Sequence, residues 1–527
     1  MSSLLLIGVW GFPAQWYLTS YIPLKPPKKV DRWARFVEWS SVENGVKSHS
    51  TTLAMSRFLM NEGWDVKLVI YGLDSLACPG NVRIDGGDRL RIALLKDLNN
   101  LREGFEREDP KSYREVLERA RRVLKLYAEG YSSEVGIDKG SIDLEVLPSV
   151  GTFKMKDKKY CFIGSTTTTL ISFELNLYEK MKKGGPDSVL LDISHGINYF
   201  PALALEAVYR AVSAYSAVRG KKVGLAVVNS DPVSRSGQRS TVHLIRSSVI
   251  ENSPLSSLSQ LCRAVEESSV KMLSKERLPS EIAEFENNYR KIKGRFDDLF
   301  NVFPKVSSYG LILYLITKLS ELTKEELSSI FQNLRFSLIN ALERREVNIV
   351  NNNEVEVRYK YAINPNVVNL FYSLDLVSEL VDAVPKSSEI EVPGVGHAKA
   401  VSLEDLEGYA EKVGLSEPAE TIFHNEIHNI RKRTSAYLKL LEGGNELYSF
   451  IYSVSDARPI DVLDEGKLKE IRDRCVKNVG KIDERNFYAH AGMERNVIAV
   501  STEEMSVGYL VDFLGEVEKI LKKVRHS

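Results

Sequence analysis

The sequence predicts an α/β fold over residues 1–250 and mainly helical structure over the rest of the chain. Two observations support this prediction. In the first half, short runs rich in Leu, Ile and Val alternate with amphipathic stretches, which is typical of a parallel sheet covered by helices on both faces. From about residue 251, apolar residues recur at helical spacing and strand alternation is scarce. The length of 527 residues fits two to four domains.

The first 250 residues are predicted to form a Rossmann-like domain with a parallel sheet. Its expected strands are the apolar runs 4–9, 66–71, 160–163, 189–193 and 223–228. Amphipathic helices are expected at 50–61, 169–183 and 201–218. The charged, helical segment near 88–130 interrupts the alternation and is interpreted as an insertion, while 141–147 and 241–246 fit edge strands.

Residues 251–400 are predicted to form a helical region that carries one β-hairpin at 346–361. Alternation on both sides of a tip at 351–353 predicts this hairpin. Helices with a hairpin are compatible with a winged helix-turn-helix, and equally with a helical linker domain that carries a β-arm. Turn-forming residues at 385–398 indicate a linker. Helical patterns resume beyond it, so residues 401–527 are predicted to be an all-α domain.

Composition excludes some classes of protein. Lys plus Arg and Asp plus Glu both number 71, which argues against binding nucleic acid by bulk attraction but allows a local basic site. Four widely spaced cysteines fit neither a disulfide framework nor a zinc knuckle, so reduced thiols are expected. The apolar opening lacks a basic flank and is too short to cross a membrane. A cytoplasmic protein without membrane association is expected.

Three loops at the predicted carboxyl ends of strands are candidate ligand sites, because ligands of open α/β sheets bind there. Hydroxyl groups and backbone amides at helix N-termini suit phosphate and ribose; the alternative is that Ser and Thr simply cap the helices. The candidates in these loops are Gly8, Trp10, Gly11, Ser165, Thr166, Thr167, Ser194, His195, Gly196 and Asn198. Residues 44–48 resemble the end of a P-loop, but Val46 separates Gly45 from Lys47, so an ATPase is not favoured.

A polar cluster at 483–492 is the sharpest candidate for chemistry. Asp483 is a plausible N-cap that places Arg485 in the first turn of a helix. Arg485 and His490 are five residues apart, about 140° on a regular helix, so a two-fold interface or a bent helix is needed to direct both at one substrate. By contrast, His424 and His428 lack the glutamate placement of zinc proteases and indicate a helix surface.

Two motifs together carry a family resemblance. Residues 192–196 (Asp-Ile-Ser-His-Gly) resemble the Asp-x-Thr/Ser-His-Gly signature of CRISPR-associated CARF domains. Residues 485–490 (Arg-Asn-Phe-Tyr-Ala-His) are similar to the Arg-x-x-x-x-His motif of HEPN ribonucleases. Their order resembles that of the Csx family of type III CRISPR systems, over roughly residues 1–250 and 400–527. Ser194 stands where many members have threonine, which keeps the hydroxyl group.

The resemblance implies an endoribonuclease of antiviral defence that is activated by cyclic oligoadenylate. Cyclic tetra-adenylate is the expected form of this activator. The ligand would lie between two CARF copies against the three loops, with Trp10 near a base and Lys47 and Ser48 at the rim. A homodimer, or a higher oligomer of dimers, would cut single-stranded RNA without metal or cofactor, leaving a 2′,3′-cyclic phosphate. The implied catalytic residues are Arg485, Asn486 and His490; Glu426, Asn429 and Arg431 are assigned to a flanking helix.

Two alternatives stay open at this point. One is a ligand-responsive DNA-binding regulator that uses the 346–361 hairpin as a wing and has no nuclease activity. The other is that the CARF loops also cleave the activator slowly, because a binding His195 cannot be told from a catalytic one.

Overall fold

The computed structural model describes residues 2–80, 82, 88–273, 277–351, 353–456 and 464–523. The chain divides into two compact units. Unit 1 comprises Met1–Asn252, Glu266–Lys291 and Asn333–Val368, and unit 2 comprises Ser253–Val265, Ile292–Gln332 and Asn369–Ser527. The expected middle region at 251–400 therefore contributes residues to both units.

Unit 1 is built on an eight-stranded sheet with the order β5-β2-β12-β11-β10-β1-β6-β7. Its parallel part consists of β11 (Val223–Ser230), β10 (Ser188–Asp192), β1 (Ser3–Val9), β6 (Asp65–Leu73) and β7 (Ile142–Leu147). The strands β12 (Arg239–Ile250), β2 (Thr19–Ile22) and β5 (Val46–Ser48) complete it, and β12 runs antiparallel to β11. The predicted Rossmann-like α/β architecture is thus confirmed.

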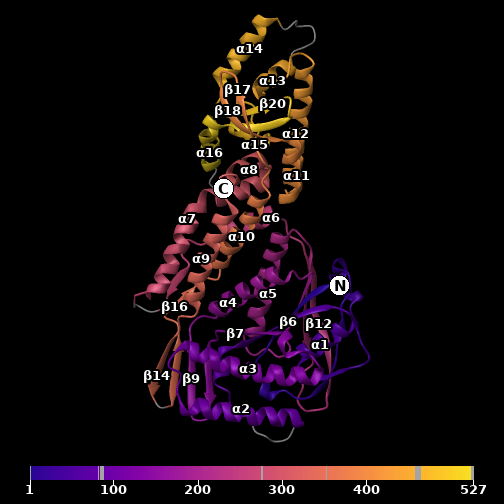
Figure 1. Cartoon of the computed structure of the whole chain (residues 1–527), viewed down its shortest axis with the longest axis vertical. Helices are drawn as coiled ribbons and strands as arrows, with labels where there is room; N and C mark the ends of the chain where they lie inside the picture. Colours follow the sequence, from indigo (N-terminus) through magenta and orange to yellow (C-terminus); the bar gives the residue numbers. More distant parts are fainter. Residues whose placement is uncertain are drawn as a thin grey trace. The chain divides into compact units, whose positions relative to one another are not determined.

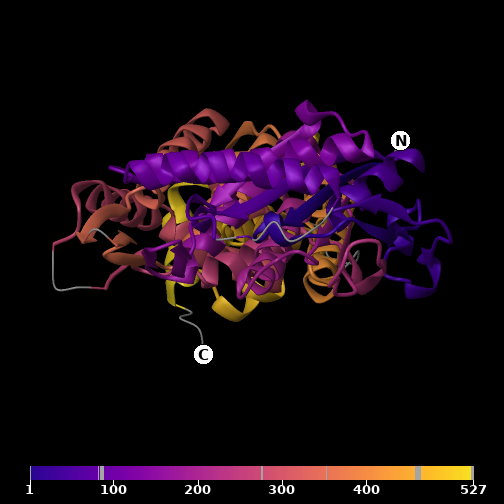
Figure 2. The same ribbon diagram turned by 90° about the horizontal axis from the view of Figure 1, so that it is seen from below.

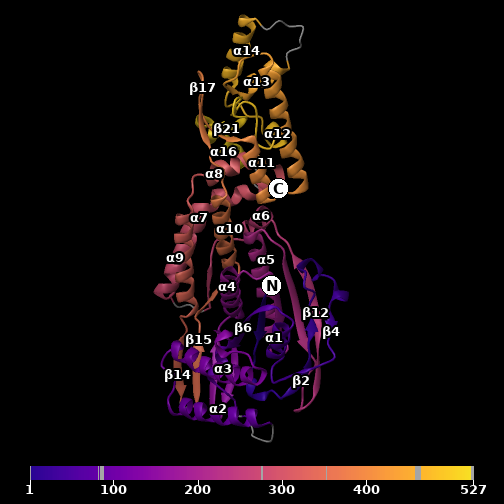
Figure 3. The same ribbon diagram turned by 45° about the vertical axis from the view of Figure 1, so that its right-hand side comes forward.

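Helices cover both faces of this sheet. Leu4 and Leu6 of β1 belong to one buried cluster with residues of α1 (Thr51–Asn61), whereas the equally buried Leu5 and Ile7 alternate to the other face. There, α5 (Phe200–Arg219) packs on β1, β10 and β11 and lies beside α4 (Thr166–Gly184) (Figure 3). Burial on both faces explains why these strands are continuous apolar runs.

The predicted helical insertion is confirmed as the pair α2 (Arg89–Arg107) and α3 (Tyr113–Val135). The side chains of Asp88 and Ser112 cap the two N-termini, and α3 ends at Gly136 with a φ of 68°. The two helices pack against each other, and α3 also contacts β6, β7 and α1. Figure 2 shows these purple helices on one side of the strands.

A second sheet in unit 1 corrects one strand assignment. Its order is β14-β15-β9-β8, formed by β14 (Glu346–Asn351), β15 (Glu354–Arg358), β9 (Lys158–Ile163) and β8 (Gly151–Met155). The apolar run 160–163 therefore does not belong to the parallel sheet as expected. The β14–β15 hairpin is confirmed, but β15 pairs with β9, so the hairpin is half of a sheet and not a free wing. Two short pairs complete the unit: β13 (Val270–Met272) with β16 (Tyr361–Ile363), and β3 (Leu24–Lys25) with β4 (Ser40–Ser41).

Unit 2 contains a five-stranded antiparallel sheet, so the all-α prediction for the C-terminal third is wrong. The sheet has the order β17 (Ser388–Val392), β18 (Gly396–Ser402), β21 (Ser506–Leu510), β20 (Ile498–Ser501) and β19 (Asn445–Leu447). The expected linker at 385–398 is the β17–β18 hairpin, in which Ile390 and Val392 are buried and alternate with exposed glutamates. Strands this short lack a distinctive period, which explains why helical patterns around them dominated the prediction.

Helices make up the rest of unit 2. Wholly within it are α6 (Pro254–Arg263), α8 (Ile312–Leu319), α11 (Leu403–Val413), α12 (Glu417–Leu438), α13 (Tyr448–Ser455), α14 (Glu465–Asn478), α15 (Glu484–Ala489) and α16 (Leu514–Lys523) (Figure 1). Three helices contribute residues to both units: α7 (Ser280–Tyr309), α9 (Lys324–Leu342) and α10 (Val367–Asp382). Across the described residues, no helix has the length and apolar character needed to span a membrane.

Candidate functional site

A buried polar network lies at the carboxyl ends of β1, β10 and β11 in unit 1. Asp192, the last residue of β10, accepts hydrogen bonds from Thr52 Oγ1 (2.7 Å) and from the backbone nitrogen of Ser194 (3.0 Å). The Thr52 hydroxyl oxygen also accepts from Trp10 Nε1 at 3.2 Å. Burial raises the pKa of Asp192, and these hydrogen bonds oppose the shift. Asp192 therefore ties the end of β10 to the first turn of α1.

His195 is fixed in the same network by its ring. Its Nε2 atom accepts a hydrogen bond from the Thr51 backbone nitrogen (3.0 Å), so the proton of the neutral ring is on Nδ1. The ring stacks on Trp16 with a centroid distance of 4.0 Å. Burial lowers the pKa of His195 to about 3. His195 is thus neutral at physiological pH and offers a fixed hydrogen-bond donor, not a positive charge.

A continuous stack of four rings joins His195 to the helical insertion. Trp16 stacks on Tyr131 of α3 at 6.2 Å, and Tyr131 stacks on His49 at 4.4 Å with nearly parallel planes. His49 is fully buried, and its two ring nitrogens contact Glu134 of α3 (3.0 Å) and Asp88, the N-cap of α2 (2.8 Å). Through these contacts, the insertion helps to position the loop that carries Trp16.

Close approaches explain the glycines of the predicted loops. A Cβ on Gly8 would lie 2.6 Å from the Thr52 side chain, so glycine allows α1 to approach β1. The backbone nitrogen of Gly11 donates to the His195 carbonyl oxygen at 2.8 Å, and a Cβ on Gly196 would clash with Pro201. These glycines hold the loops together whether or not they also contact a ligand.

The predicted aromatic residue is enclosed. Trp10 has no exposed surface, whereas Trp16 is half-buried and lies against His195. The indole that this edge of the sheet presents to the outside is therefore Trp16, which the sequence did not single out.

The remaining predicted ligand residues are spread over several elements. Lys47 is exposed on β5, while the adjacent Ser48 is buried and accepts a hydrogen bond from the Ser50 nitrogen at 3.1 Å. Asn198 is exposed and has a φ of 50°. The hydroxyl segment Ser165, Thr166 and Thr167 begins α4 after β9, with Ser165 as the cap that accepts from the Thr167 nitrogen at 3.2 Å. The segment follows the second sheet, so the parallel sheet does not position it as the sequence suggested.

In unit 2, a short helix presents Arg485 and Asn486. The Asp483 carboxylate accepts from the Asn486 nitrogen at 2.8 Å and so caps α15, as predicted. Arg485 and Asn486 are exposed in its first turn. The helix ends at Ala489, and His490 follows it with a φ of −110° and a ψ of 32°. The separation of about 140° assumed a regular helix, and His490 lies just beyond one.

His490 is held by a buried carboxylate on α12. Its Nδ1 atom donates to Glu426 Oε2 at 2.7 Å; the His490 side chain is 43% exposed and that of Glu426 only 5%. Glu426 raises the pKa of His490 through this hydrogen bond, against the effect of partial burial. Among the described residues, no hydrogen bond to His490 Nε2 occurs.

Glu426, Asn429 and Arg431 all lie on α12, which flanks the site through Glu426 as expected. Glu426 contacts His490, but Arg431 forms a bidentate pair with Glu407 at 2.9 and 2.6 Å, and Asn429 is exposed. The same helix carries His424 and His428, both on its surface. No set of three or more His, Cys, Asp or Glu side chains within the described part of the chain is arranged to bind a metal ion.

A left-handed turn fixes the backbone after His490. Ala491 and Gly492 have φ values of 51° and 77°, and the Gly492 nitrogen donates to the Phe487 carbonyl oxygen at 2.8 Å. The buried Tyr509 of β21 donates its hydroxyl proton to the Gly492 carbonyl oxygen at 2.7 Å. The position of His490 thus depends on both α12 and the unit 2 sheet.

Comparison with known proteins matches both regions to one family. Residues 5–232 match the model of the CARF domain of CRISPR system endoribonuclease Csx1, and residues 416–510 match the model of its HEPN domain. The chain belongs to the CARF–HEPN Csx family. A relative named CRISPR system endoribonuclease Csx1, from Methanocaldococcus jannaschii, is 31% identical over 172 residues, which are 32% of this chain and 33% of that protein. The match therefore spans about a third of the relative's length.

Both candidate sites lie inside the matched regions. The CARF match contains the Asp192–His195 network with Thr51 and Thr52, and the HEPN match contains Glu426 and the 485–490 motif. Sequence reasoning missed Thr51 and Thr52, although they begin a predicted helix that follows a polar segment. That signal indicates a helix N-terminus. It does not indicate which strands of the sheet have carboxyl ends facing that N-terminus.

Proposed function

We propose that this CARF–HEPN protein is a CRISPR-associated endoribonuclease that cyclic oligoadenylate activates. The observation that carries the proposal is the contact of Glu426 with His490, five residues after the exposed Arg485, in a chain whose N-terminal region matches a CARF domain. A positioned imidazole with a pKa raised from 6.5 exchanges protons near neutral pH. An exposed guanidinium in the first turn of a helix suits a phosphodiester.

The cleavage needs only the side chains and the substrate's own hydroxyl group. The ribose 2′-oxygen attacks the adjacent phosphorus while a neutral histidine accepts the 2′-hydroxyl proton. The bond from phosphorus to the 5′-oxygen breaks, and a protonated histidine gives that oxygen a proton. The products are a 2′,3′-cyclic phosphate and a 5′-hydroxyl, with no metal. Arg485 stabilises the negative charge that develops on the phosphoryl oxygens.

Two copies of the chain would supply the two histidines. The His490 of one copy serves as base and the His490 of the other copy as acid. In each copy, Glu426 binds Nδ1 of the ring, so that Nε2 is available. Asn486, also exposed in the first turn of α15, would orient the scissile phosphate. A homodimer is therefore part of the proposal.

The site at the carboxyl ends of β1, β10 and β11, in the CARF region, would bind the activator. Cyclic tetra-adenylate is the first choice. The exposed groups of the site suit a cyclic nucleotide: Trp16, whose two ring faces lie against His195 and Tyr131, offers only the edge of its half-buried indole to adenine, and Lys47 offers charge for phosphate. The neutral His195, Ser194 and the backbone around Gly196 offer hydrogen bonds to ribose and phosphate without a fixed charge. A ligand bound there would change the position of α1 through the contacts that Thr51 and Thr52 make with His195 and Asp192.

A direct assay tests the proposal. The full chain is incubated with labelled single-stranded RNA and a chelator, with and without cyclic tetra- or hexa-adenylate. We expect ligand-stimulated cleavage that leaves cyclic phosphate ends, and its loss in His490→Ala. Cleavage that needs added metal, or that His490→Ala retains in full, would contradict the mechanism. Specific duplex DNA binding without RNA cleavage would instead favour a regulator.

A further inference from the structure

Unit 1 contains a basic pocket whose lining includes none of the residues of the network around Asp192 and His195. Its volume is about 510 Å³, and it is lined by residues from the N-terminus of α3, the 343–345 loop and the β14–β15 hairpin. Six basic side chains line it: Lys111, Arg114, Arg344, Arg345, Arg358 and Lys360. Only two acidic side chains do so, Glu343 and Glu346. Each of these cations also pairs with a carboxylate within or just outside the lining, so an anionic ligand would bind here by displacing the exposed carboxylates.

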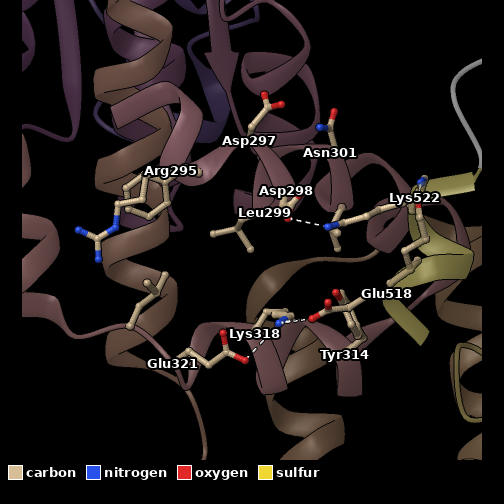
Figure 4. A pocket seen from close by; sticks show the side chains of 15 residues that line it. Arg295, Asp297, Asp298, Leu299, Asn301, Tyr314, Lys318, Glu321, Glu518 and Lys522 are labelled. Atoms are coloured by element: carbon tan, nitrogen blue, oxygen red, sulfur yellow. Dashed lines mark hydrogen bonds and ion pairs between the residues drawn. The ribbon is translucent and has the colours of Figure 1, made fainter. Parts of the chain in front are cut away.

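The larger cavity of unit 2 has a different electrostatic character. It has a volume of about 820 Å³, and acidic and basic side chains alternate around it (Figure 4). Lys318 pairs with Glu518 (2.5 Å) and Glu321 (3.2 Å), and Lys522 pairs with Asp298 (2.9 Å). The lining therefore neutralises itself and indicates no charged ligand. Of these two cavities, the pocket in unit 1 is the one whose lining has more basic than acidic side chains.

Arg345 forms the rigid, positively charged floor of the basic pocket. The side chain is fully buried, and its guanidinium donates to Asp74 (2.5 Å) and to the Ser149 carbonyl oxygen (2.6 Å). It also lies over the Tyr359 ring at 4.4 Å. Its Nε atom has no acceptor among the described residues. A buried donor without a partner is uncommon in proteins and marks a place where a ligand oxygen is favourable.

The cations at the mouth are available for exchange. Arg114 pairs with Glu118 one helical turn away, with side chains 88% and 49% exposed, and Arg344 pairs with Glu281, at 60% and 36%. Exposed pairs of this kind contribute about 0–1 kcal/mol, so a dianionic phosphate can replace the carboxylates. Arginine suits phosphate in particular, because its planar fork binds two oxygens at once.

We propose that this pocket binds the phosphate groups of a nucleotide or of a short single-stranded RNA. The aromatic side chains at the pocket, Tyr113 and Tyr361, are 5% and 2% exposed and offer no face for stacking a base. Recognition therefore rests on phosphate and is independent of base sequence. Binding here does not require the cleavage reaction.

The test is a binding titration with the full-length His490→Ala chain, which separates binding from cleavage. Fluorescence anisotropy of a short labelled RNA is measured over a range of salt concentrations, with AMP and inorganic pyrophosphate as competitors. In Arg114→Gln/Arg344→Gln we expect about tenfold weaker RNA binding. We also expect the slope of log K against log salt to fall by about 1.4, since each lost phosphate contact contributes about 0.7 for single strands.

The matched control is Arg32→Gln/Lys125→Gln in the same background. Arg32 pairs with Glu38, and Lys125 pairs with Glu129 one turn away on α3, so two exposed and paired cations are again removed. Unchanged RNA affinity in the control supports the pocket, and competition by AMP or pyrophosphate at equal phosphate concentration identifies free nucleotides as its ligands. Equal losses in both double variants, or none in either, would overturn the proposal, even if cleavage by the wild-type chain is confirmed.

Discussion

His490 Nδ1 lies 2.7 Å from Glu426 Oε2, although 64 residues separate the two in the sequence. The carboxylate is buried under the surface that exposes the imidazole, and this contact raises the His490 pKa. A protonated ring is thereby favoured at higher pH than in a free histidine. The acid and base steps of the proposed cleavage are tuned by a residue outside the 485–490 motif.

The first prediction concerns Glu426→Gln and the pH dependence of cleavage. Glutamine keeps the size and a hydrogen bond but removes the charge, so the pKa of His490 falls and both limbs of the pH–kcat/KM profile move to lower pH. We expect roughly tenfold lower activity at neutral pH, less than the loss of about 10²–10⁴ expected on removing a general acid–base group. The control is Glu420→Gln, an exposed change on the same helix. A smaller rate with an unmoved profile would contradict the role of Glu426.

The same contact predicts a pH-dependent contribution to stability. Because the folded-state pKa of His490 is raised, the contribution is fully present below the unfolded value of about 6.5 and is lost as the pH rises through the folded value. The melting temperatures of wild type and Glu426→Gln should differ most near pH about 6 and converge in mildly alkaline buffer. A difference that grows with pH would show that the coupling has the opposite sign.

Gly492 carries the third prediction. At a φ of 77°, its Cβ in an alanine variant would lie 2.9 Å from the Tyr509 hydroxyl, in the turn that follows His490. We expect Gly492→Ala to destabilise unit 2 by about 1–2 kcal/mol, from left-handed strain, and to lower cleavage further by displacing His490. Urea unfolding and initial rates measure the two effects. Gly515→Ala in α16, where no atom lies near the added carbon, should leave both unchanged or raise stability slightly.

Local signals located both motifs because each depends on neighbours in the sequence. Asp192 ends an apolar strand, and Asp483 caps the helix that follows it, so strand and cap patterns were sufficient. Long-range pairing was not accessible in this way. β9 pairs with β15 across 195 residues, as measured between Lys159 and Glu354, and no periodicity in either segment specifies that partner. For the same reason, the sequence does not specify the contact of Glu426 with His490 or that of Thr52 with Asp192.

Trp16 carries the fourth prediction, on activator binding. Its ring lies between His195 and Tyr131, so Trp16→Leu removes the ring on which both stack and loosens the loop that carries His195. We expect about tenfold weaker binding of cyclic tetra-adenylate, because ordering a loosened loop on binding costs about 0.5–1.5 kcal/mol per immobilised side chain. Calorimetric titration measures it. Trp39→Leu, a buried indole packed on Trp33, is the matched control and should leave the affinity unchanged if the fold is retained.

The Arg345–Asp74 pair gives the last prediction, on stability. Both side chains are fully buried, at the end of β6 where Ser149 also donates to Asp74. Arg345→Met leaves the Asp74 carboxylate buried without its cation, which costs about 3–5 kcal/mol. The double variant Arg345→Met/Asp74→Leu removes both charges and should recover most of that loss, because the desolvation penalty of the pair disappears with it. Urea unfolding of the full chain measures both variants, and Arg344→Met is the exposed control. If the double variant is no more stable than Arg345→Met, then Arg345 stabilises the fold by packing on Tyr113 and Tyr359 and not by charge pairing.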